Sequence, residues 1–83
     1  MKNDNEFIQL NDLYASAFLL LNDISLDHIE KDKTGRGTFV FSKTSQSKRL
    51  LQQFIQLKAR VEPTAFVLAQ KKLKQLLYLP NNT

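Results

Sequence analysis

The residues that could carry out chemistry in this 83-residue chain are few. His28 is its only histidine, and it lies between Asp27 and Glu30. Successive side chains of a strand point to opposite faces, so we expect His28 and Glu30 to share a face and Asp27 to point away. A metal centre usually needs three or four ligands, so we expect neither a metal site nor an acid–base centre here.

Two short strings look like motifs for phosphate binding or catalysis. Gly35-x-Gly37 lies between two expected strands and not before a helix N-terminus, which indicates a hairpin turn rather than a phosphate loop. Ser45-x-x-Lys48 matches a serine-nucleophile string, but Ser45 falls at an expected helix start, where a hydroxyl caps the backbone. The chain has no cysteine, which excludes disulfides and thiolate chemistry. We therefore expect no enzyme activity and no cofactor.

The strongest chemical signal is the uneven distribution of charge. The net charge is +4, yet residues 1–32 hold seven of the eight acidic groups and residues 33–83 hold ten of the twelve basic groups. A basic half is a candidate surface for polyanions. The candidate nucleic-acid-binding residues are Arg36, Lys43, Lys48, Arg49, Lys58, Arg60, Lys71, Lys72 and Lys74. If they converge, they would contact phosphates without reading the base sequence.

Aromatic residues could add stacking to such a surface. Lys71 and Lys74 share one side of an expected helix, and Tyr78 follows by one turn, where its ring could extend that stripe. Phe39 and Phe41 resemble a stacking pair on an RNA-binding sheet, but we expect them to be buried. Two alternatives stay open: the acidic and basic halves could pair internally, or the lysines could form a solvated face without a ligand.

The elements that position the first of these residues follow from hydrophobic spacing. Phe7–Leu10 is expected to be a short strand or an extended lead into a helix. Asn11 is the expected N-cap of that helix, and Asn22 is expected to end it in a left-handed conformation. Residues 24–29 follow a mostly period-two pattern, and residues 38–42 are rich in residues that favour strands. With the turn at 33–37 between them, these two segments predict an antiparallel hairpin.

Two more helices follow the hairpin. Thr44 or Ser45 caps the first, and its expected buried side consists of Leu50, Leu51, Phe54, Ile55 and Leu57. Pro63 suits the first turn of the second helix. The expected apolar face of that helix consists of Ala65, Phe66, Ala69, Leu73, Leu76 and Leu77.

Together these elements predict one small α+β domain over residues 1–83. It has a short N-terminal strand, a helix, an antiparallel β-hairpin, and two helices packed on one sheet face, with residues 1–5 and 80–83 frayed. The apolar runs are too short to span a bilayer, and the polar, acidic N-terminus does not resemble a secretory signal. We expect a cytoplasmic protein without a membrane partner.

Three motifs run through these elements. The first is an opening with Phe7, Asp12 and Leu13 that leads into an Ala/Leu-rich helix. The second is a Gly-Arg turn, Gly35 and Arg36, that leads into the Phe-Val-Phe strand at 39–41. The third is a Val-acid-Pro step, Val61, Glu62 and Pro63, that starts a Lys-rich helix. In this combination nearly the whole chain resembles a small bacterial and phage family catalogued as a domain of unknown function. The resemblance implies the fold above and a mobile-element or phage setting, and it supplies no catalytic residues. The family pattern has Asp where this chain has Glu62, and because Glu is a poorer cap we expect a looser start of the last helix. It also has Gly where this chain has Asn22.

We expect the protein to be a non-catalytic binding module. Sequence-independent binding of DNA or RNA through the phosphate backbone is the first hypothesis. The alternative is a protein–protein interaction module, a homodimer or an adaptor, because the first helix has more apolar residues than one buried stripe needs.

Overall fold

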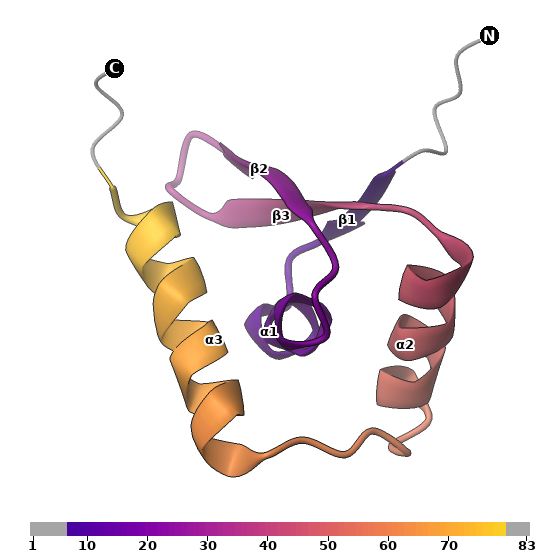
Figure 1. Ribbon diagram of the computed structural model, residues 1–83. Coiled ribbons are helices and arrows are strands. Elements are labelled where there is room, and N and C mark those ends of the chain that lie inside the picture. The colour runs from indigo at the N-terminus through magenta and orange to yellow at the C-terminus, as the bar shows by residue number, and fades with distance from the viewer. Residues whose placement is uncertain (1–6, 80–83) are drawn as a thin grey trace, which may run out of the picture.

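The structure is a computed structural model that describes residues 7–79 (Figure 1). Along the chain its elements are β1 (Phe7–Leu10), α1 (Leu13–Leu21), β2 (Leu26–Lys31), β3 (Gly37–Ser42), α2 (Ser45–Ile55) and α3 (Pro63–Leu77). This order confirms the α+β fold expected from the sequence. The expected fraying of residues 1–5 and 80–83 lies outside the described residues.

The sheet is antiparallel, with strand order β1-β3-β2. The N-terminal segment is a strand, because Phe7 pairs with Ser42 and Leu10 pairs with Phe39. β3 takes the central position, where both of its backbone edges are hydrogen-bonded. Its run of large apolar side chains suits that place, since Phe39 and Val40, whose side chains point to opposite faces, are both buried.

All three helices lie on one side of the sheet (Figure 1). α1 lies under the strands, and α2 and α3 flank it on opposite sides. In the core, Phe39 and Phe41 of β3 belong to one cluster with Leu19 of α1 and Leu73 of α3. α1 therefore needs apolar residues on several sides, which explains its high apolar content.

The start and end of α1 each fall one residue later than expected. The N-cap is Asp12 and not Asn11: Asp12 Oδ1 accepts from the backbone N–H groups of Tyr14 (2.8 Å) and Ala15 (3.3 Å). Asn11 Oδ1 instead accepts from the Thr38 hydroxyl (3.0 Å) on the sheet. Asn22, the expected left-handed residue, still donates its N–H to carbonyls of α1 and has a negative φ. The left-handed residue is therefore the next one, Asp23, with φ 65°.

Thr44 caps α2, as one of the two expected candidates. Thr44 Oγ1 accepts from the Ser47 N–H (3.0 Å), and Ser47 Oγ accepts from the Thr44 N–H (2.8 Å), which forms a capping box. Ser47 is buried while making these bonds. The start of α2 is therefore determined by residues three positions apart.

The end of α2 differs from the expectation that Ile55 and Leu57 are buried. Both are exposed, Ile55 to 68% and Leu57 to 91%. Leu57 has φ 63°; its N–H donates to the Phe54 carbonyl (3.1 Å), and the Lys58 N–H donates to the Gln53 carbonyl (2.8 Å). This is a Schellman motif with leucine at the left-handed position. It reverses the chain before Leu57 can reach the core.

α3 starts as expected with Pro63 in its first turn. Glu62 Oε1 accepts from the Ala65 N–H (2.7 Å), so Glu62 caps the helix and the looser start expected from this residue is not observed. Ala69 and Leu73 are buried, and the other residues of the expected apolar face are half-buried. Within residues 7–79, none of the helices combines the length and apolar composition needed to cross a membrane.

Candidate functional site

The nine predicted phosphate-binding residues are spread over several parts of the fold. By element they are Arg36 in the β2–β3 turn, Lys43 after β3, Lys48 and Arg49 in α2, Lys58 and Arg60 between α2 and α3, and Lys71, Lys72 and Lys74 in α3. Lys43 is half-buried and the others are exposed. Because α2 and α3 lie on opposite sides of α1, the structure places their cations on separate flanks (Figure 1).

These cations are not neutralised by contact with the acidic groups of the described chain. Within residues 7–79, the ion pairs shorter than 4.0 Å are both made by His28, and none involves a lysine or arginine. Several carboxylates have other uses: Asp12 and Glu62 cap helices, and Asp32 holds a turn. The internal pairing of the two halves, left open from the sequence, is therefore not observed in this part of the chain.

The β2–β3 turn presents Arg36 on a fixed backbone. Asp32 Oδ1 accepts from the Thr34 N–H (2.8 Å), the Thr34 hydroxyl (2.6 Å) and the Arg36 N–H (3.0 Å), and Gly35 supplies the positive φ of 87°. The Thr34 hydroxyl first, and then the Arg36 N–H, lower the pKa of Asp32 below its usual value. The part that Asp32 plays in holding this turn was not predicted from the sequence, although an Asp two residues before Thr34 is typical of an Asx-turn.

The same turn rests on the end of α3. A Cβ atom at Gly37 would lie 2.5 Å from Leu77 Cδ1, so any other residue here would have to displace the Leu77 side chain. The contact joins segments that are distant in the chain and brings Arg36 to the end of α3 that carries Lys74 and Tyr78. We call Arg36, Lys71, Lys74 and Tyr78 the turn–helix corner.

Not every lysine of α3 belongs to this corner. At about 100° per residue, Lys71, Lys74 and Tyr78 fall within a sector of about 60° around the helix. Lys72 lies about 160° around from Lys74. Two of the three predicted α3 lysines therefore share the side of α3 that carries Tyr78, and Lys72 lies on another side.

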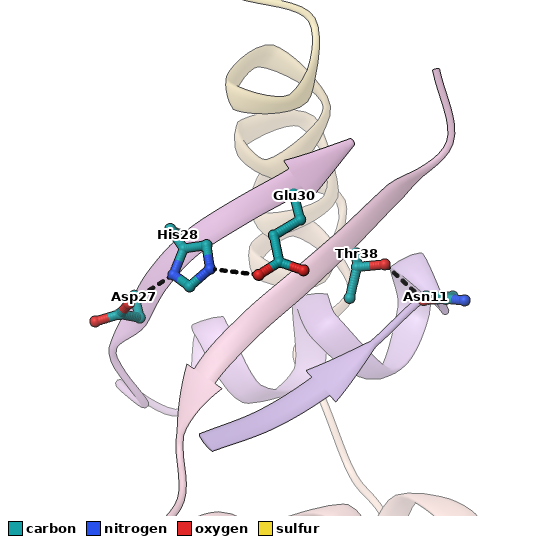
Figure 2. Close-up of polar contacts among 5 residues, drawn as sticks. All are labelled: Asn11, Asp27, His28, Glu30 and Thr38. Atoms are coloured by element: carbon teal, nitrogen blue, oxygen red, sulfur yellow. Dashed lines mark hydrogen bonds and ion pairs between the residues drawn. The ribbon is translucent and has the colours of Figure 1, made fainter. Parts of the chain in front are cut away.

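A second polar cluster lies on the face of the sheet that no described helix covers (Figure 2). His28 Nδ1 lies 2.6 Å from Asp27 Oδ2, and His28 Nε2 lies 2.9 Å from Glu30 Oε2, so each ring nitrogen is within hydrogen-bond distance of a carboxylate. The expectation that Asp27 points away from His28 is wrong. A bulge shifts the register between Leu26 and His28, so the alternation of side chains breaks at Asp27 and its carboxylate reaches the ring.

The two carboxylates determine what the His28 ring can do. Hydrogen bonds to Glu30, and then to Asp27, raise the pKa of His28 above 6.5. When the ring is protonated, both of its nitrogens donate to these carboxylates, and neither has a lone pair to offer a metal or a proton. No group of metal-ligating side chains within residues 7–79 has the arrangement of a metal site. In its protonated form, His28 is a cation paired with two carboxylates on the sheet surface.

A model of a known protein family matches most of the chain. No curated protein and no solved structure shows significant similarity to the chain. The family model covers residues 5–79, which includes every helix and strand described above. The protein therefore belongs to the family described as Domain of unknown function (DUF5659).

Proposed function

We propose that this protein is a non-catalytic module that binds nucleic acid through the phosphate backbone, without reading the base sequence, in a bacterial mobile-element or phage setting. The observation that carries the proposal is that no lysine or arginine within residues 7–79 is ion-paired with a described carboxylate. Exposed cations that are not neutralised internally can displace counterions from phosphates. The setting rests on the family resemblance.

The turn–helix corner adds to the support, because it combines cations from two elements. Arg36 comes from a turn that Asp32 holds rigid, and Lys71 and Lys74 come from the same face of α3. A rigid backbone removes the main-chain part of the ordering cost of binding, although each long side chain still loses its rotamer freedom. The cations of α2 supply a second flank for the same polyanion.

The salt dependence of binding tests the proposal. Affinity for fluorescently labelled DNA or RNA oligonucleotides, measured by anisotropy, should fall steeply as the salt concentration rises. Lys74→Gln removes one phosphate contact and should reduce the slope of log K against log salt by about one. Gln75→Ala, at an exposed and uncharged position of the same helix, serves as the control. Absence of binding at micromolar protein and low salt would refute the proposal.

Protein–protein interaction is the second candidate function, and the end of α2 favours it. The apolar surplus of α1 is used inside the fold, so it no longer supports an interface. Ile55 and Leu57, however, are large apolar side chains left in solvent two positions apart in the chain. Sedimentation of the free protein tests the homodimer form: a strictly monomeric protein at high concentration would contradict it.

A further inference from the structure

We propose that the turn–helix corner binds single-stranded nucleic acid, with an unpaired base stacked on Tyr78 and neighbouring phosphates on Arg36, Lys71 and Lys74. This inference rests on the proposed function and adds to it the strand state of the ligand and a contact to a base. It is carried by one exposed aromatic ring and by the cations that the fold places around it.

Tyr78 has the surroundings of a stacking platform. It is 71% exposed, although it directly follows the half-buried Leu77. Its N–H donates to the Lys74 carbonyl (3.0 Å), so its backbone belongs to the last turn of α3. Within residues 7–79, the ring pairs are Tyr14–Phe66 and Phe18–Phe54, and neither includes Tyr78. Most of its ring surface is therefore open to a ligand.

The cations around Tyr78 match the path of a nucleic-acid backbone. Lys71 and Lys74 share the ring's side of α3 and span, with Tyr78, about 10 Å along the helix axis. Arg36 directly precedes Gly37, which lies against Leu77 at this end of α3, so the turn presents its cation next to the last turn of the helix. Proteins that bind single strands without sequence preference combine aromatic rings, on which bases stack, with positive groups that follow the backbone.

The ring is what distinguishes single strands from duplexes at this corner. Base faces in a duplex are already stacked on their neighbours and cannot lie on Tyr78, whereas unpaired bases can. Cations alone would favour the duplex, because its phosphates are more densely spaced. The α2 flank lacks this feature: its only aromatic residue, Phe54, is half-buried against Phe18.

Tyrosine fluorescence reports on the stack directly. The chain has two tyrosines and no tryptophan, so Tyr14→Phe leaves Tyr78 as the only such fluorophore. We expect an oligothymidine of about 12 nucleotides to quench this emission on binding, since one stacking site falls well within that length. A duplex of the same length should bind at low salt without comparable quenching. Quenching by the two ligands to the same extent would overturn the inference.

Affinity measurements separate the ring from the charges. In the Tyr14→Phe background, Tyr78→Leu should weaken binding of the oligothymidine about tenfold and leave duplex affinity unchanged. Tyr78→Phe should retain the affinity, because it keeps the ring. An unchanged single-strand affinity in Tyr78→Leu would overturn the inference but leave the proposed function intact. Failure of both ligands to bind the unaltered protein would overturn the proposed function itself. Circular dichroism of each variant verifies that it is folded.

Discussion

Leu57 is the residue whose replacement we expect to stabilise the fold. It occupies the left-handed position of the Schellman motif that ends α2, with φ 63°, and 91% of its surface is exposed. Glycine is the usual residue at this position, because a Cβ atom is crowded by the following carbonyl in the left-handed conformation. We therefore predict that Leu57→Gly makes the protein more stable, although it deletes a large apolar side chain.

The magnitude follows from two opposing terms. The left-handed conformation costs about 1–2 kcal/mol for a residue with a Cβ atom, and glycine removes that cost. Glycine also gives the unfolded chain more freedom, which offsets about 0.5–1 kcal/mol of the gain. The side chain buries almost nothing, so no hydrophobic term is lost. The net gain lies between about 0 and 1.5 kcal/mol. Its midpoint of about 0.75 kcal/mol corresponds to a rise of about 3–6 °C in Tm for a domain of this size.

Thermal and denaturant unfolding of three variants would test this reasoning. Leu57→Ala keeps the Cβ atom and removes the rest of the side chain, so its stability should stay within about 0.5 kcal/mol of the wild type. Asp23→Gly changes the other left-handed residue, and its gain should be smaller, because aspartate tolerates this conformation better than leucine does. If Leu57→Gly proves no more stable than Leu57→Ala, the backbone argument is wrong.

Two further predictions concern the sheet. The raised pKa of His28 means that the folded state binds its proton more tightly than the unfolded chain, so this stabilisation is complete below 6.5 and is lost as the pH rises through the folded-state pKa. The loss of stability in His28→Gln, from denaturant unfolding, should therefore be larger at about pH 5.5 than at about pH 9, and equal losses would contradict the ion-pair account. Gly37→Val places side-chain atoms against Leu77, whose side chain must shift, and should destabilise the protein by about 0.5–1.5 kcal/mol. A smaller loss in a Leu77→Ala background, measured by thermal unfolding, would confirm the contact, and an undiminished loss would refute it.

Features that depend on residues within four positions of one another could be predicted from the sequence. Thr44 as one of two candidate caps, Pro63 in the first turn of the last helix, and the burial of Phe39 and Phe41 all follow from such local patterns. The small errors also have a local cause. Neighbouring residues with similar capping ability stand at both ends of α1, and the chain path selects Asp12 and Asp23 over the asparagines beside them.

The candidate site depended on tertiary structure more than the secondary-structure elements did. The sequence identified the basic residues, and helix spacing placed Lys71, Lys74 and Tyr78 on one side of the last helix. The sequence could not show that Gly37 packs on Leu77, which brings the turn with Arg36 to the end of that helix. It also could not separate the α2 cations from those of α3, because that depends on which sides of α1 the two helices occupy (Figure 1).

The sequence by itself therefore determined the kinds of elements, their order, and the surplus of positive charge in the later part of the chain. Only the tertiary structure decided that β1 joins β3, that a bulge turns Asp27 toward His28, and that the end of α2 stays uncovered. The physical reason is the range of the interactions. Helix caps and periodic burial are set by near neighbours, whereas strand order, register shifts and the docking of a turn on a helix depend on contacts between distant segments that no local pattern encodes.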